Sequence, residues 1–140
     1  MNIKRSIAIG LTLFIALTLA VSTVLAGNPH FVGNISIVRD GNSLTISGKL
    51  AGLGNEDQVE IRVEAEAACI NPGSKKPQAA NKESFSAQGT FPVQNGKADF
   101  SLTLTATFQP NCSPPMSVVW TNIVVIDLTH GLTASFPGPF

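Results

Sequence analysis

The residues best suited to covalent chemistry are the only two cysteines of the chain, Cys69 and Cys112. Cys69 ends a run that starts at Val59, in which every odd position is apolar and the even positions through Glu66 are charged. Such alternation is typical of a strand with one buried face, so Cys69 is expected to point inward. Cys112 continues the inward parity of a second alternating run. In an exported domain two inward thiols most simply form a disulfide. Free buried thiols and a metal site are the alternatives.

A copper site in an exported β-sandwich needs two histidines, one cysteine and a weakly bound methionine. Cys112 and Met116 have the right types, but no histidine lies between them. His30 and His130 lie near the two ends of the mature chain and are predicted to be exposed polar residues. His30 follows Pro29 and is fourth after the expected cleavage, so it does not complete an amino-terminal copper site. The sequence therefore predicts no metal and no cofactor.

The acidic residues are the remaining candidates for catalysis. Glu60, Glu64 and Glu66 share the outward face of the strand that ends at Cys69. Paired carboxylates can hydrolyse glycosides, but Arg62 lies among these three and a solvated charged face explains them as well. The chain has no GxSxG or HExxH motif and no glycine-rich phosphate loop. We expect a protein that is not an enzyme, with no catalytic residues.

Residues 1–26 have the features of a cleaved signal peptide: a basic start (MNIKR), an apolar run and Val24-Leu25-Ala26 before the cut. An uncleaved membrane anchor is the alternative, because the apolar run approaches the roughly 20 residues that cross a bilayer. Cleavage leaves one domain, 27–140, outside the cell, either secreted or at the cell surface. Seven basic and nine acidic residues remain in it, a net charge of −2. We expect no binding to nucleic acid, and contact with a membrane only if the leader is kept.

The elements that position these residues are predicted to be short strands. Turn residues separate five alternating runs, and a sixth run is apolar on both parities. The sixth is expected to be covered on both faces or to change faces at a bulge. The pattern predicts an all-β fold, an antiparallel β-sandwich of six or seven strands of the immunoglobulin-like type. A small closed barrel is the alternative. The predicted strands are 31–37, 44–50, 59–69, 85–93, 98–108 and 116–128.

One hairpin is predicted in detail. Asn95-Gly96 is the strongest short hairpin signal, because a type I′ turn needs positive φ at both central residues. A two-residue loop there pairs the flanking strands so that Phe91 lies opposite Phe100. Pro92 has no N–H to donate, so its strand is expected at a sheet edge or at a bulge.

A row of hydroxyl groups is expected on the outer face of the fifth strand, formed by Ser101, Thr103, Thr105 and Thr107. Ice-binding surfaces use such geometry. One row is not an array, and threonine is simply a good strand former.

Four segments resemble a group of small exported bacterial proteins of unknown function. This resemblance implies export from a bacterium and pairing of the two cysteines, and it implies no activity or ligand. Ser74 stands where such proteins have the second glycine of Asn-Pro-Gly-Gly. The segments are SGKLAGLGN (47–55), CINPG (69–73), NGKADF (95–100) and CSPPM (112–116).

The leading hypothesis is a structural or interaction module without catalytic activity, with an unknown protein or envelope partner. The loops beside the two cysteines are the expected contact surface, because function is commonly carried by loops on a rigid scaffold. The alternative is a small-ligand or carbohydrate-binding module that uses the loops at 70–83 and 109–115. The single tryptophan, Trp120, is predicted to lie in the core, so an aromatic platform for sugars is hard to assemble.

Overall fold

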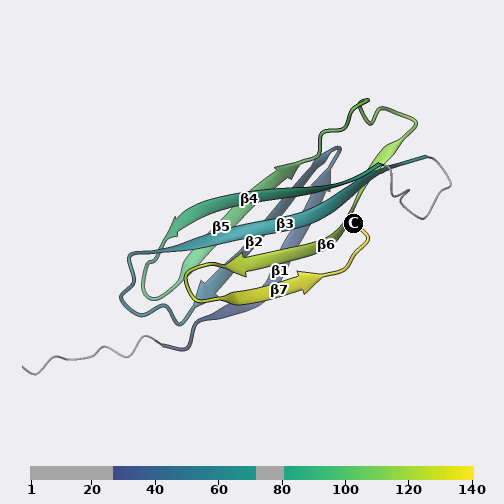
Figure 1. Cartoon of the computed structure of the whole chain (residues 1–140). Helices are drawn as coiled ribbons and strands as arrows, with labels where there is room; N and C mark the ends of the chain where they lie inside the picture. Colours follow the sequence, from purple (N-terminus) through teal and green to yellow (C-terminus); the bar gives the residue numbers. More distant parts are fainter. Residues whose placement is uncertain (1–26, 72–80) are drawn as a thin grey trace, which may run out of the picture.

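The computed structural model describes residues 27–71 and 81–140, which form seven β-strands in two antiparallel sheets (Figure 1). The predicted β-sandwich is confirmed. The expected leader, 1–26, and residues 72–80 of the long loop lie outside the described residues. Within the described ranges no helix is long and apolar enough to cross a membrane. One sheet has the order β1 (His30–Asp40), β2 (Ser43–Ala51), β5 (Ala98–Thr105), and the other β4 (Lys82–Pro92), β3 (Gln58–Ile70), β6 (Ser117–Asp127), β7 (Leu132–Phe136).

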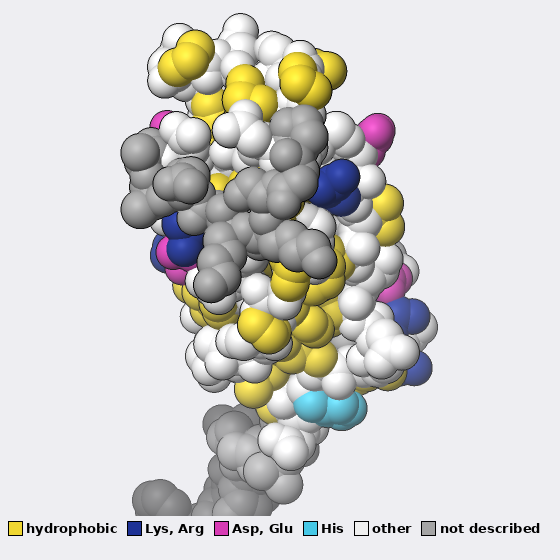
Figure 2. All heavy atoms as spheres, turned by 90° about the vertical axis from the view of Figure 1, so that its right-hand side faces the viewer, with side chains coloured by type: hydrophobic (Ala, Val, Ile, Leu, Met, Phe, Trp, Pro, Cys, Tyr) yellow, Lys and Arg dark blue, Asp and Glu magenta, His cyan; other side chains and the backbone are white. Residues whose placement is uncertain are grey.

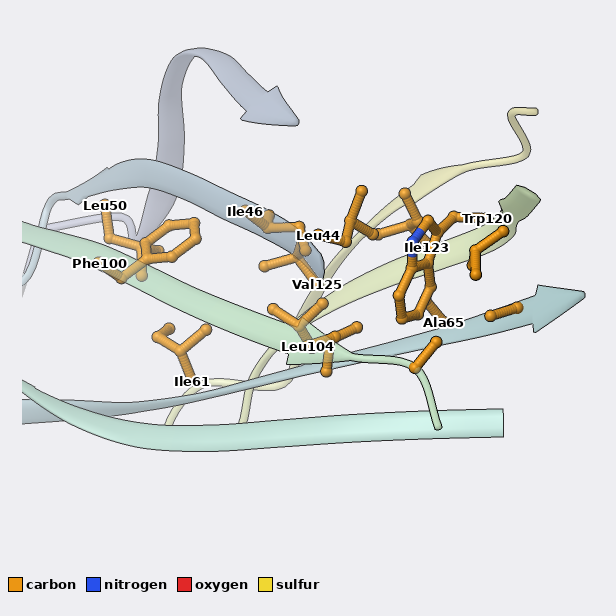
Figure 3. Close-up of a cluster of buried hydrophobic side chains, with 14 of the residues drawn as sticks. Leu44, Ile46, Leu50, Ile61, Ala65, Phe100, Leu104, Trp120, Ile123 and Val125 are labelled. Carbon is orange, nitrogen blue, oxygen red and sulfur yellow. The ribbon is translucent and has the colours of Figure 1, made fainter. Parts of the chain in front are cut away.

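The core lies between the two sheets, where their apolar faces meet (Figure 3). All six odd positions of β3 from Val59 to Cys69 are buried, as the alternation predicts. Trp120 on β6 is completely buried, which confirms its predicted place in the core. Its ring packs edge-on against Phe85 of β4, with 5.7 Å between the ring centroids.

The predicted turn at Asn95-Gly96 is present, but the prediction that its two flanking strands pair with each other is wrong. Both residues have positive φ, 53° and 71°, and the two flanking residues exchange backbone hydrogen bonds. Beyond that pair the strands separate, since β4 joins β3 in one sheet and β5 joins β2 in the other. Phe91 and Phe100 therefore meet across the core, with ring centroids 6.2 Å apart. Alternation shows which face is buried, and a partner in the opposite sheet satisfies it as well as a neighbour in the same sheet.

The two edge strands of the larger sheet differ in how well they are predicted. Pro92 ends β4 at the sheet edge, which is one of the two places expected for it. The other edge strand, β7, is not among the six predicted segments. It is only five residues long, and its inward side chains are half-buried rather than buried. These inward side chains are Leu132, Ala134 and Phe136.

Strand β6 changes its buried face at a bulge. Val118 and Trp120 are buried at even positions, whereas Ile123 and Val125 are buried at odd positions. The pairing with β3 shifts register between these two groups, and Asn122 has a φ of 51° there. Of the two expectations for this strand, the one in which it changes its buried face at a bulge is thus confirmed. The extra residue brings Asn122 onto the outer face of the sheet, where it contacts β3.

Candidate functional site

The disulfide end of the sandwich was expected to carry the contact surface. Cys69 and Cys112 are bonded, as predicted, with S–S 2.04 Å, and the bond joins the end of β3 to the loop between β5 and β6. A hollow of about 70 Å³ lies beside it, lined in part by Phe108 and Met116. Ligand pockets have volumes of roughly 300–1,000 Å³, so this hollow is too small for a ligand. This hollow is smaller than the ligand pocket expected beside the disulfide, and residues 72–80 of the expected loop lie outside the described residues.

The loop between β5 and β6 instead presents apolar groups to solvent. Pro110, Pro114 and Pro115 are exposed. Figure 2 looks onto this end of the molecule, and apolar side chains gather at its tip. These three prolines, the apolar tip, lie within the 109–115 segment expected to contact a partner.

The opposite end contains a cluster that the sequence did not predict. His130 was expected to be exposed, but its side chain is only 15 % exposed and both ring nitrogens are engaged. Its Nδ1 lies 2.6 Å from Asp127 Oδ2 and its Nε2 lies 2.7 Å from Glu56 Oε1. Asp127 is fully buried, and its Oδ1 also accepts the backbone N–H groups of residues 129 and 130. This Glu56–His130–Asp127 set, the histidine tie, joins the β2–β3 loop to the β6–β7 turn.

The histidine tie connects the two loops through hydrogen bonds to both ring nitrogens of His130. Burial disfavours the charged ring, but the hydrogen bonds to Glu56 and Asp127 outweigh it and raise the pKa of His130. His30, by contrast, is exposed as predicted. Across residues 27–71 and 81–140, no group of three or more His, Cys, Asp or Glu side chains could hold a metal ion.

A groove of ligand size lies on the outer face of the larger sheet, over β4, β3 and β6. Its volume is about 390 Å³, within the range of ligand pockets. Polar and apolar side chains both line it, which is typical of sites that orient a small ligand. The lining residues are Glu64, Ala65, Glu66, Ser84, Phe85, Ser86, Asn122 and Val124. We call this the Glu66 groove.

Strand register and the bulge bring the polar groups of the groove together. Glu66 lies opposite Ser84 of β4 and opposite Thr121 of β6. The bulge places the next residue, Asn122, where its Nδ2 donates a 2.7 Å hydrogen bond to Glu66 Oε2. Asparagine tolerates the left-handed backbone conformation better than most residues, which suits it to this position. Bulges often re-aim side chains in this way beside functional sites.

The carboxylate at the centre of the groove is ionised and held in place. Lys82 Nζ lies 2.8 Å from Glu66 Oε2, the oxygen that also accepts from Asn122. The hydrogen bond from Lys82, followed by the one from Asn122, lowers the pKa of Glu66. These contacts use two of the roughly four acceptor positions of a carboxylate. The arrangement can therefore accept hydrogen bonds from hydroxyl or N–H groups of a ligand.

The sequence placed the acidic residues correctly but did not predict the groove. Glu60, Glu64 and Glu66 do share the outward face of β3, and Arg62 Nη1 lies 3.4 Å from Glu64 Oε1. The expected solvated face is thus present. What was missed is the contribution of Asn122 from a different strand. The change of buried parity between Trp120 and Ile123 is the signal that locates the bulge.

No protein family, curated protein or solved structure matches this chain. The resemblance to small exported bacterial proteins therefore stays a prediction. A function has to be argued from the site itself rather than from relatives or from the fold.

Proposed function

We propose that this protein is an exported interaction module without catalytic activity, secreted or kept at the cell surface, that binds a saccharide chain of the envelope in the Glu66 groove. The observation that carries this proposal is the carboxylate of Glu66, fixed by Lys82 and Asn122 inside a groove of ligand size. A polar group that is already ordered loses little freedom when a ligand binds, so more of the interaction free energy appears as affinity.

The chemistry of the groove favours a neutral ligand rich in hydroxyl groups. The charges of Glu64 and Glu66 are balanced by the nearby Arg62 and Lys82, so neither a strong anion nor a strong cation is selected. Carboxylate oxygens and serine hydroxyls exchange hydrogen bonds with sugar hydroxyls. Val124 offers an apolar surface for the C–H groups of a sugar ring. No tryptophan or tyrosine lines the groove, so each contact is expected to be weak.

Export is supported by the leader-like residues 1–26 and by the disulfide, which is typical of oxidising compartments. The resemblance to exported bacterial proteins adds a bacterial source to this proposal. The strand order supports an immunoglobulin-like assignment, because strands 1, 2 and 5 share one sheet and strands 3, 6 and 7 the other. The fourth strand departs from the constant-domain arrangement, since it joins the second sheet.

The apolar tip supports a second candidate function, contact with a protein partner. Three exposed prolines on one loop offer apolar surface to a partner. This second candidate uses the loop beside Cys112 that was expected to be the contact surface. It is compatible with a saccharide in the Glu66 groove. The two sites are separate enough to be tested with separate variants.

Retention of the mature protein on envelope polysaccharide, together with a glycan array, tests the proposal. Glu66→Gln should weaken binding about tenfold, because the charged acceptor is lost. Glu60→Gln is the matched control, since Glu60 has the same outward direction on the same strand but does not line the groove. Equal losses in the two variants, or no retention of the native protein, would contradict the saccharide site. Loss only on Pro114→Ser with Pro115→Ser would assign binding to the apolar tip.

A further inference from the structure

The outer face of the smaller sheet carries hydroxyl groups in two dimensions, not in the single row that the sequence predicts. Strand pairing aligns outward residues of β1, β2 and β5 into three consecutive rows. Seven of the nine positions are serine or threonine. The rows are Ser36–Ser47–Ser101, Val38–Thr45–Thr103 and Asp40–Ser43–Thr105. We call these nine residues the hydroxyl face.

Neighbouring hydroxyls on this face order one another. Thr45 Oγ1 lies 2.9 Å from Thr103 Oγ1, and Ser43 Oγ lies 3.3 Å from Thr105 Oγ1. A hydroxyl has one donor and two acceptor positions, so each hydrogen-bonded pair keeps about one donor and three acceptors for groups outside the protein. The positions on β5 are exposed and those on β2 are half-exposed. The face is therefore both accessible and prearranged.

Charge is confined to the margins of the hydroxyl face. Asp40 occupies one corner, and the ion pair of Lys49 with Asp99, 3.4 Å between Nζ and Oδ1, lies beyond the row of Ser47. Val38 ends the middle row on β1 and is 57 % exposed. The interior of the face thus combines hydroxyl and methyl groups without a charged or aromatic side chain.

Strand geometry gives the face a repeat in two directions. Adjacent strands lie about 4.8 Å apart, and outward residues repeat about every 6.8 Å along a strand. The pairing of β2 with β5 runs through eight consecutive residue pairs without a shift of register. Ice presents oxygen atoms on its crystal faces with two repeats of the same order. Ordered hydroxyl groups at such spacings can replace or hold water molecules of that lattice.

We propose that the hydroxyl face binds the surface of ice. An uncharged interior fits this partner, because a charged group orders water around itself and disturbs a lattice match. A neutral polysaccharide is the competing partner, and it is disfavoured because the face has no aromatic side chain on which a sugar ring can stack. This inference is independent of the Glu66 groove, which lies on the other sheet.

The test compares two exposed threonines on edge strands of opposite sheets. The mature protein, with its disulfide intact, is equilibrated with slowly growing ice, and the fraction captured in the ice is measured together with thermal hysteresis. Thr103→Lys should reduce capture about tenfold, because it puts a long charged side chain in the middle row. Thr133→Lys on β7 is the matched control and should be captured like the native protein. Thermal unfolding of each variant verifies the fold.

A milder variant tests whether the loss of ice capture by Thr103→Lys comes from misfolding. Thr103→Val keeps the shape and the strand preference but removes one hydroxyl, so it should lose part of the capture that Thr103→Lys loses. Glu66→Gln should leave capture unchanged. The proposal is overturned if ice excludes the native protein, or if Thr103→Lys is captured as well as Thr133→Lys. Retention on a neutral polysaccharide that depends on Thr103, without capture in ice, would assign the face to the competing partner.

Discussion

The two ends of the sandwich, whose loops can be followed in Figure 1, are fastened in different ways. At one end the disulfide fixes the β5–β6 loop to β3, and at the other the histidine tie fixes the β2–β3 loop to the β6–β7 turn. Each fastened loop crosses from the smaller sheet to the larger one. Two of the three connections that cross between the sheets are thus fixed, β5–β6 by a covalent bond and β2–β3 by hydrogen-bonded charges. The first responds to reductant and the second to pH.

The largest expected effect is loss of the disulfide. Cys69→Ser and Cys112→Ser should each lower the free energy of unfolding by about 4 kcal/mol, since the bond closes a loop of 43 residues. A domain of this size has roughly 6–17 kcal/mol in total, so the loss is a large part of it. Urea unfolding measures the change, and the double variant should be no less stable than either single one. Clearly unequal single variants would show that the thiols act through something other than their bond.

Removing the centre of the histidine tie should have the next largest effect. Asp127→Ala leaves His130 and two backbone N–H groups without their buried acceptor, which should cost about 3 kcal/mol. Asp99→Ala is the control, because its side chain is 81 % exposed and the change should stay within about 0.5 kcal/mol. Urea unfolding near pH 6 compares the two. If both variants lose the same small amount of unfolding free energy, the histidine tie does not hold the two loops together.

The pH dependence of stability separates the two ends further. The pKa of His130 is raised in the folded protein, so the stabilisation it provides is fully present below its ordinary pKa of about 6.5. That stabilisation is lost as the pH rises through the raised pKa, because a neutral ring can donate to only one of Glu56 and Asp127. His130→Gln should therefore differ most from the native protein at acidic pH. Unfolding at a series of pH values measures this, and a constant difference would contradict it.

The Glu66 groove should contribute least to stability, since its ion pair is partly exposed. Glu66→Gln is expected to change the free energy of unfolding by about 0.5 kcal/mol or less. Such a small change, together with weaker ligand binding, would separate the groove from the two fastened ends. A loss of stability as large as that of Asp127→Ala would instead show that the contact between Glu66 and Asn122 holds β3 and β6 together.

The alternation of apolar residues predicted the faces of the strands well, and with them the disulfide. Cys69 lies on the buried face of β3, where its parity placed it. The same alternation did not reveal which strand lies beside which, because apolar partners such as Phe91 and Phe100 can meet within a sheet or across the core. The connection that was predicted wrongly, 93–97, is short, and its Asn95-Gly96 turn is compatible both with strands that pair and with strands that diverge.

The polar clusters were harder to predict, because each joins residues from distant parts of the chain. His130 was wrongly predicted to be exposed, because Glu56, 74 residues away, supplies one of the two side-chain hydrogen bonds to its ring. One local signal was available: Asp127 continues the buried parity of Ile123 and Val125, and a buried carboxylate needs partners. For the Glu66 groove the signal was the change of parity around Asn122.

The bulge in β6 adds one residue that the core does not use. Without Asn122 the spacing between Trp120 and Ile123 would be even, and a regular strand would still bury both side chains. The core therefore does not need the extra residue, and its consequence is that an amide group of β6 reaches the carboxylate of Glu66 on β3.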